Sequence, residues 1–316
     1  MLPNPKPKLI VILGPTSTGK TKLAVKLAKV FNSEIVSADS RQVYKGMDIG
    51  TGKDLDEYII TKTRKHPSAP LGTGKNTKTI SYHLIDVVSP KSQFSLAQYQ
   101  KLAYKAINDI IKRGKTPLLV GGTGLYIQSV VDGYQLADVK PDKETRKRLN
   151  KKTIKQLQAL ARKYQIRLNE SDFQNKRRLV RAVEIKIKDQ RSKIVRKNVP
   201  KYNTLILGIK YPKKVIDERI DERLIHRLEK EGMVEEIKKL RKNGVSWKRL
   251  DDFGLEYRFI AKYLKGELTY DEMAKKLSIA SHQFAKRQMT WFKRDKRIKW
   301  IKNYNQARKF VKGFLN

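Results

Sequence analysis

The residues LGPTSTGKT, from Leu13 to Thr21, have the composition of a loop that binds phosphate groups. Gly14, Gly19, Lys20 and Thr21 occupy the fixed positions of the pattern G-x-x-x-x-G-K-[ST]. Backbone N–H groups of such a loop bind phosphate oxygens, the lysine adds positive charge, and the final hydroxyl can bind Mg²⁺. The expected phosphate-binding residues are Gly14, Pro15, Thr16, Ser17, Thr18, Gly19, Lys20 and Thr21, with Thr21 as the metal ligand.

A carboxylate that follows an apolar strand could hold the metal at a bound phosphate, and two carboxylates follow apolar runs. Asp39 lies in VSADSRQVY and Asp86 in HLIDVV. The carboxyl ends of parallel strands form the ligand-binding edge of an open α/β sheet, so we expect Asp39 near the phosphate loop. The alternative is that Asp39 only caps the next segment. Thr123, between glycines in VGGTGLY, follows a third apolar run and either contacts a substrate or belongs to a turn without chemistry.

Three arginines are spaced four residues apart in DERIDERLIHRL. Arg219, Arg223 and Arg227 therefore share one face of a predicted helix. The neighbouring aspartates and glutamates make ion pairs the simple interpretation. The alternative is that one guanidinium faces a diphosphate, which it binds well.

The segment AKRQMTWFKRDKRIKW, residues 285–300, mixes basic side chains with Trp291, Phe292 and Trp300. Such a mixture suits a nucleic-acid groove in which a base stacks on an aromatic ring. The alternative is an amphipathic helix whose aromatic side chains belong to the core.

The elements that must position these residues alternate between strand and helix. We predict strands at 8–13, 33–40, 82–88 and 202–211, and a strand with a Gly-rich turn at 116–124. We predict helices at 20–31, 125–133, 212–243 and 269–294, and a helix through about Arg113 that follows the capping-box pattern of Ser95 and Gln98. Residues 61–79 are predicted to form a solvated loop. This alternation predicts an α/β fold with a parallel sheet. Residues 140–200 hold 21 Lys and Arg against 6 Asp and Glu and show helical spacing. We therefore predict a P-loop α/β core from 1–139 and 201–316, and a basic all-helical insertion at 140–200.

The composition restricts the classes of function. The chain of 316 residues has 71 Lys and Arg against 31 Asp and Glu, a net charge of +40, which favours a polyanionic partner over mere solubility. It has no cysteine, which excludes disulfides, thiol catalysis and Cys-ligated zinc. The N-terminal residues do not have the pattern of a signal peptide, and no apolar run reaches the roughly 18 residues of a membrane span. We expect a cytoplasmic, monomeric protein with no membrane partner.

Several stretches together resemble the tRNA dimethylallyltransferase, or tRNA isopentenyltransferase, family. They are GPTSTGKT, SADSRQVYKGMDIGT, HLIDVVSP, PLLVGGTGLY, RRLVRAVEI, GLEYRFIAKYLKGELTYDEM and AKRQMTWF, in the family's order from residue 14 to 292. The sequence DSRQVYKGMDIGT and the late KRQMTWF are much more specific than the phosphate loop. One departure is GLEYR at 254–258, where the family often has Gly-Tyr-Arg or Gly-Tyr-Lys.

The resemblance implies transfer of a dimethylallyl group from dimethylallyl diphosphate to N6 of the adenosine 3′ of the tRNA anticodon. It implies Asp39 as general base, with Thr123 and Arg223 also at the reacting centre and Mg²⁺ as cofactor. It implies that the basic insertion contacts the anticodon stem-loop. The tRNA-binding residues that it implies are Asp39, Ser40, Arg41, Gln42, Thr123, Arg146, Arg177, Arg178, Arg181, Lys286, Arg287 and Gln288.

Three other functions remain open at this point. A small-molecule kinase or ATPase would use the same loop and turn over ATP without tRNA. An adenylate isopentenyltransferase would prenylate free AMP, ADP or ATP and would need neither the basic insertion nor the KRQMTWF block. A non-catalytic RNA-binding protein would need the charge but not Asp39, Thr123 and the phosphate loop together.

Overall fold

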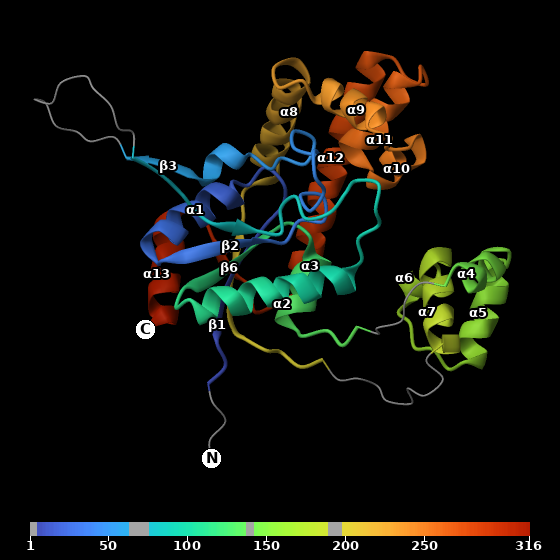
Figure 1. The fold of residues 1–316 in the computed structure, drawn as a ribbon, viewed down its shortest axis with the longest axis horizontal. Coiled ribbons are helices and arrows are strands. Elements are labelled where there is room, and N and C mark those ends of the chain that lie inside the picture. The colour runs from blue at the N-terminus through green and yellow to red at the C-terminus, as the bar shows by residue number, and fades with distance from the viewer. Residues whose placement is uncertain (1–4, 63–75, 137–141, 189–197) are drawn as a thin grey trace, which may run out of the picture. The chain divides into compact units, whose positions relative to one another are not determined.

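The central element of the fold is a six-stranded parallel sheet in the order β5-β2-β6-β1-β7-β8. Its strands β1, β2 and β6 are labelled in Figure 1. The computed structural model describes residues 5–62, 76–136, 142–188 and 198–316. The strands are β1 (Lys8–Leu13), β2 (Ser33–Ser37), β5 (Tyr82–His83), β6 (Thr116–Gly121), β7 (Asn203–Ile209) and β8 (Lys299–Ile301). This arrangement confirms the predicted α/β class.

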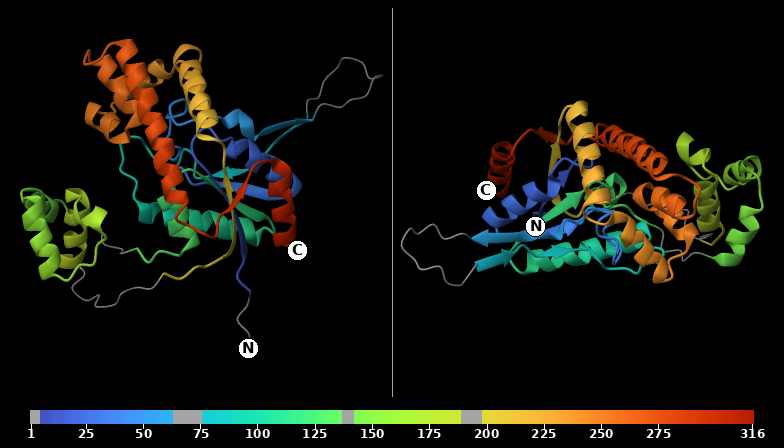
Figure 2. Two further views of the ribbon diagram at one scale, coloured as in Figure 1. Left: turned by 180° about the vertical axis from the view of Figure 1, so that it is seen from behind. Right: turned by 90° about the horizontal axis from the view of Figure 1, so that it is seen from above.

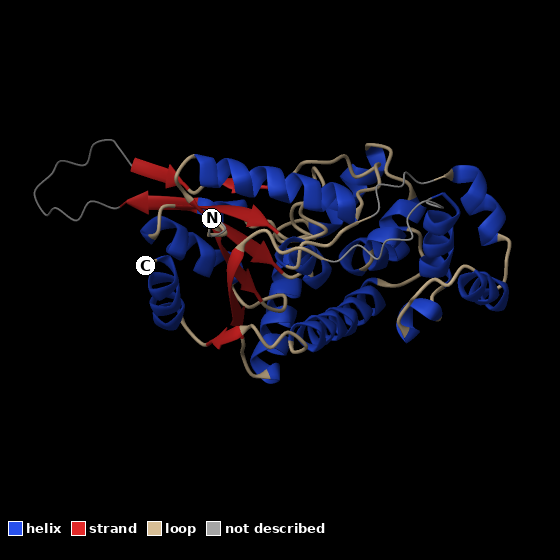
Figure 3. Cartoon of the chain, turned by 90° about the horizontal axis from the view of Figure 1, so that it is seen from below, coloured by secondary structure: helices blue, strands red, loops and turns tan. Residues whose placement is uncertain are grey.

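Helices bury both faces of this sheet. Because successive side chains of a strand point to opposite sides, each strand contributes to two apolar clusters. In β1, Leu9, Val11 and Leu13 join one apolar cluster, whereas Ile10 and Ile12 join another. The first cluster is covered by α2 (Leu96–Lys112) and α3 (Gly124–Val131), the second by α1 (Lys20–Val30) and α13 (Tyr304–Leu315). Figure 2 shows α1 and α13 on the side of the sheet opposite α2, and Figure 3 shows the strands enclosed by helices.

A helical cluster packs beside the residues that follow β2. It contains α8 (Lys213–Glu229), α9 (Met233–Lys242), α10 (Trp247–Phe253), α11 (Leu255–Leu264) and α12 (Tyr270–Phe292). The single helix predicted at 212–243 is wrong, because Gly232 adopts a left-handed φ of 76° and separates α8 from α9. Helices α10, α11 and α13 and strand β8 were not predicted.

The segment after β5 also differs from the prediction. A strand was expected at 82–88, but β5 ends at His83 because Leu84 and Asp86 have positive φ angles of 65° and 56°. Residues before and after the expected 61–79 loop form an antiparallel pair, β3 (Ile59–Lys62) with β4 (Asn76–Thr79), preceded by the 3₁₀ helix η1 (Leu55–Tyr58). Residues 63–75 of that expected loop lie outside the described residues.

The chain divides into two compact units, one of residues 1–133 with 200–316 and one of residues 134–199. Among its described residues, the second unit consists of α4 (Lys143–Asn150), α5 (Ile154–Lys163), α6 (Glu170–Phe173) and α7 (Lys176–Lys188). Leu149, Leu157, Leu179 and Val183 form its apolar centre. In the described parts of the chain, no helix has both the length and the apolar composition to cross a lipid bilayer.

Candidate active site

The phosphate loop connects β1 to α1, as predicted, and is shaped to receive an anion. Gly19 has a φ of 71° and precedes the first turn of α1, whose N–H groups have no intrahelical acceptor. Thr18 Oγ1 and Lys20 Nζ donate hydrogen bonds to Pro15 O at 2.8 and 2.6 Å. The buried Ser17 hydroxyl has no hydrogen-bond partner among the described residues. The first-turn N–H groups of α1 are thus the donors that a bound phosphate would use.

Asp39 and Thr123 come together at the carboxyl edge of the sheet. The Ser40 N–H donates to Thr123 Oγ1 at 3.0 Å, and the Thr123 N–H donates to Ala38 O at 3.1 Å. Gly121 permits this approach, because a Cβ there would lie 2.2 Å from Ala38 O. In the sheet, β6 lies between β1 and β2, so the Thr123 turn lies between the phosphate loop and Asp39.

The Asp39 carboxylate is held by one of its two oxygens. Oδ1 accepts hydrogen bonds from the backbone N–H groups of Arg41 at 2.8 Å and Gln42 at 3.4 Å. Oδ2 has no partner among the described side chains and backbone groups. Asp39 therefore does cap a turn, as the alternative interpretation had it, but it also lines a cavity with one oxygen available.

That cavity, of about 1230 Å³, is lined by the phosphate loop, Asp39, Thr123 and Arg223. Each of the three α8 arginines has a different partner. Arg223 donates to Thr16 Oγ1 of the phosphate loop. Arg227 is buried and pairs with Asp54 at 3.1 Å, while the Arg219 guanidinium lies 4.4 Å from the Tyr211 ring centre. Arg223 is thus the α8 arginine directed at the phosphate loop, which agrees with the residue singled out by the resemblance.

Desolvation within the cavity lowers the pKa of both cations at the phosphate loop. Desolvation lowers the pKa of Lys20 to about 8, although the Asp39 carboxylate acts in the opposite direction. Desolvation likewise lowers the pKa of Arg223 to about 10, and the Arg227 charge adds to this decrease. Arg223 therefore stays charged at neutral pH, whereas Lys20 loses its charge in mildly alkaline solution.

The KRQMTWF segment of α12 packs directly against the VGGTG turn. Gln288 accepts a hydrogen bond from the Thr16 N–H and donates one to Gly122 O, both at 2.9 Å. A Cβ on Gly124 would lie 2.3 Å from Trp291 Cδ1. The glycines thus admit Gln288 and Trp291, and Gln288 joins the phosphate loop to the end of β6. A tRNA contact by Gln288, Lys286 or Arg287 stays a prediction.

The aromatic side chains of the 285–300 segment belong to the core. Phe292 is buried, and Trp291 and Trp300 pack against the same apolar cluster on the α2–α3 face of the sheet. The interpretation of these rings as stacking platforms for nucleic-acid bases is therefore wrong. The alternative, an amphipathic helix with core aromatics, describes residues 285–292 of α12, whereas Trp300 lies on β8.

In the second unit, three of the expected tRNA-binding arginines contact carboxylates. Arg146 Nε and Arg181 Nη1 lie 2.9 and 2.7 Å from the oxygens of Glu184, whose side chain is buried. Arg178 pairs with Asp172, and Arg177 is exposed. Glu184 holds two guanidiniums that remain partly exposed, so their outer faces can still meet phosphates. Their contact with tRNA stays a prediction.

Three residues that lie in or near the cavity were not predicted from the sequence to belong to the site. Glu256, at the start of α11, lines the cavity, and burial raises its pKa against the influence of the Arg223, Arg227 and Arg41 charges. Tyr58 of η1 also lines the cavity, and burial raises its pKa. Lys53 is buried near the Asp39 turn. Only the GLEYR departure at 254–258 gave a signal for any of them.

The residues present fit a Mg²⁺ ion held jointly with a ligand. Thr21, the last residue of the phosphate loop, lines the cavity and carries a hydroxyl. Among the described residues, no three His, Asp or Glu side chains are grouped to hold a metal by themselves. Mg²⁺ commonly takes one or two protein oxygens and completes its shell with phosphate oxygens and water. Asp86, the other metal-ligand candidate, instead pairs with Lys53 and does not line the cavity.

The fold and the cavity define a P-loop α/β protein whose phosphate loop shares one cavity with a strand-end carboxylate. A model of the family described as IPP transferase matches residues 42–295. The chain is 42% identical to tRNA dimethylallyltransferase 1 of Syntrophus aciditrophicus, over 97% of this chain and 98% of that protein. It is also 42% identical to tRNA dimethylallyltransferase 1 of Parabacteroides distasonis, over 93% and 92% of the two chains. The chain belongs to the IPP transferase family.

Solved structures agree with this membership. The tRNA isopentenylpyrophosphate transferase of Bacillus halodurans matches with a TM-score of 0.69 and 33% identity, over 98% of this chain and 97% of that one. A eukaryotic dimethylallyltransferase acting on tRNA matches with a TM-score of 0.66 and 24% identity, over 90% and 69% of the two chains, which shows the fold.

Proposed function

We propose that this protein transfers a dimethylallyl group from dimethylallyl diphosphate to N6 of the adenosine next to the 3′ side of the tRNA anticodon. The observation that carries this proposal is that the phosphate loop and a carboxylate with one available oxygen share one cavity, on either side of Thr123. The names of the relatives support the same reaction.

The residues of the cavity divide the chemistry between them. The bond from N6 to the prenyl carbon forms as the bond from that carbon to oxygen breaks, and the electron pair of the broken bond leaves with diphosphate. Asp39 Oδ2 accepts the proton released from N6. Lys20, Arg223 and the loop N–H groups stabilise the negative charge on the departing diphosphate. Mg²⁺ bound at Thr21 would supply further positive charge at the diphosphate.

The acceptor must enter the cavity as an unstacked base, because N6 of a stacked adenine cannot reach Asp39. The net charge of +40 suits an acceptor that carries a phosphate backbone. Residues 140–200, with their excess of basic residues, are proposed to contact the anticodon stem-loop. We also propose that the enzyme acts as a monomer in the cytoplasm, and sedimentation and cell fractionation test these two points.

The acceptor preference gives a direct test. Labelled dimethylallyl diphosphate is incubated with tRNA and, separately, with AMP, and the products are analysed as nucleosides. We expect N6-isopentenyladenosine from tRNA at the position 3′ of the anticodon and at least about 100-fold less product from AMP. Affinity for tRNA should fall steeply with salt, because each phosphate contact releases counterions. Comparable transfer to AMP would instead identify an adenylate isopentenyltransferase.

ATP gives the control for the kinase and ATPase alternatives. Hydrolysis of ATP, or phosphate transfer from it, without any need for tRNA would replace the proposed function. Binding of tRNA without any transfer would favour a non-catalytic RNA-binding protein.

The affinity for dimethylallyl diphosphate should depend on pH through Lys20. The pKa of Lys20 in the free protein is lowered to about 8 by desolvation, and a bound diphosphate would raise it again. Lys20 is charged below this pH, so affinity is expected to be flat there and to fall by up to about tenfold per pH unit above it. Calorimetry without tRNA measures this between pH 6.5 and 9.5. The Lys20→Ala variant should bind more weakly and lack the decrease; a decrease that persists in it would refute the assignment.

A further inference from the structure

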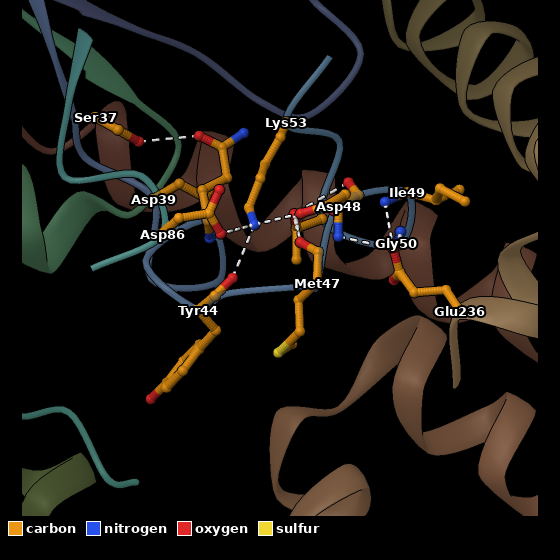
Figure 4. Close-up of polar contacts among 12 residues, drawn as sticks. Ser37, Asp39, Tyr44, Met47, Asp48, Ile49, Gly50, Lys53, Asp86 and Glu236 are labelled. Carbon is orange, nitrogen blue, oxygen red and sulfur yellow. Dashed lines mark hydrogen bonds and ion pairs between the residues drawn. The ribbon is translucent and has the colours of Figure 1, made fainter. Parts of the chain in front are cut away.

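The loop from Tyr44 to Lys53, which we call the clamp loop, lines the cavity with residues 50–52 and is held by a buried cation. Lys53 is 1% exposed, less than any other lysine among the described residues. Its ammonium donates to Tyr44 O at 2.8 Å, to Asp48 Oδ1 at 2.6 Å and to Asp86 Oδ1 (Figure 4). These acceptors use all three protons of the ammonium, so the cation is fully satisfied. Lys53 thus fastens both ends of the clamp loop to the segment after β5.

A half-buried anion holds the outer turn of the same loop. The Glu236 carboxylate, from α9, accepts hydrogen bonds from the N–H groups of Asp48, Ile49 and Gly50 at 2.7, 2.6 and 3.2 Å (Figure 4). It also accepts one from the Tyr257 hydroxyl at 2.8 Å. Hydrogen bonds to a charged acceptor are about twice as strong as neutral ones. Glu236 therefore fixes the clamp loop to the helical cluster, on the side away from Lys53.

The clamp loop in turn holds Gln42 and the turn of Asp39. Gln42 Nε2 donates to Gly52 O at 2.9 Å, and Gln42 Oε1 accepts from the Ser37 hydroxyl at 2.9 Å. Both ends of the Gln42 amide are thus fixed, one by the clamp loop and one by β2. The Gln42 N–H is one of the two donors to Asp39 Oδ1. The contacts form a continuous path from Lys53 and Glu236 to the carboxylate in the cavity.

We propose that Lys53 and Glu236 are positioning residues for prenyl transfer, acting through Gln42 on the orientation of Asp39. Neither side chain lines the cavity, whereas Asp39, Gln42 and Gly52 do. This inference rests on the proposed function, because it assigns Asp39 the proton. A displacement of about 1 Å at a reacting group can lower a rate by about 100-fold. Loosening the clamp loop should therefore affect kcat more than substrate binding.

The principal test compares Lys53→Met with Lys45→Met, an exposed lysine of the same loop. Methionine keeps most of the volume of Lys53 and removes its charge. The partner carboxylates of Asp48 and Asp86 are 56% and 38% exposed, so water can solvate them and the variant should fold. We expect single-turnover transfer to fall by about 10- to 100-fold in Lys53→Met with little change in donor or tRNA affinity, and no change in Lys45→Met. Unchanged transfer in Lys53→Met would overturn the proposal.

A double-variant cycle separates positioning from a general loss of structure. If Lys53 acts through Gln42, Lys53→Met should add little to the defect of Gln42→Ala. Defects that multiply in the double variant would contradict this path. Glu236→Gln, which keeps the shape of the carboxylate, should show the same kcat defect. If thermal unfolding shows that Lys53→Met does not fold, Glu236→Gln takes its place in the test.

Amide hydrogen exchange in residues 44–53 gives a readout that does not require activity. Exchange should be faster in Lys53→Met and Glu236→Gln than in the wild type, and unchanged exchange would overturn the proposal. An absence of transfer by the wild type would refute the proposed function instead, and the exchange result would still decide whether the two charges hold the clamp loop.

Discussion

Asp39→Asn is expected to lower single-turnover prenyl transfer by roughly 10²–10⁴-fold, the usual contribution of a general base. The amide oxygen can still accept the hydrogen bond that the Arg41 N–H gives to Oδ1 at 2.8 Å. The variant therefore keeps the turn, but the group in the place of Oδ2 can no longer take a proton from N6. Binding of tRNA and of donor should change little, because neither is held mainly by this group.

The matched control is Asp109→Asn, on the exposed surface of α2, where the carboxylate pairs with Arg113. It should transfer at the wild-type rate. If Asp39 served only as a cap, its replacement would lower stability by about 1 kcal/mol and spare the chemistry. Transfer measured beside thermal unfolding distinguishes the two roles. An Asp39→Asn protein that is less stable but catalytically normal would remove Asp39 from the mechanism.

The parts of the fold that could be predicted are those that local patterns determine. The apolar run of β1 must be buried on both faces, and the phosphate loop fixes the strand and helix on either side of it. Ser95 and Gln98 form the capping box that their spacing predicted. The break between α8 and α9 was missed because Gly232 lies within an otherwise helical pattern, and a single glycine does not always end a helix.

The site could be predicted only where residues follow strands. Asp39 and Thr123 were brought together by the rule that parallel strands end at one edge, although the position of β6 between β1 and β2 had no local signal. Lys53 and Glu236 could not be predicted, because their partners are backbone groups and carboxylates that only the tertiary fold brings near. Asp86 was misplaced for the same reason, since its ion pair with Lys53 depends on the left-handed turn after β5.

The phosphate loop allows a second large effect to be predicted. In the structure, Lys20 Nζ donates to Pro15 O within its own loop, a contact that a diphosphate oxygen can replace. Lys20→Ala removes a charge that acts on the leaving group inside a cavity, where the effective dielectric constant is lower than in water. We expect a roughly 10²–10³-fold lower rate of transfer, the range found when one donor to a developing negative charge is removed.

Affinity for dimethylallyl diphosphate should fall together with this rate. The affinity for tRNA should remain within about twofold of the wild type, because the loss of one cation among the many of this chain makes little difference to the binding of a polyanion. Arg223→Ala should behave like Lys20→Ala, because Arg223 contacts the same loop at Thr16. Lys29→Ala is the matched control, since Lys29 is exposed at the far end of α1. Calorimetry with the donor, filter binding with tRNA and single-turnover transfer measure the three quantities. A Lys20→Ala protein that lost tRNA binding but kept the rate of transfer would show that the loop holds RNA phosphate and not the prenyl donor.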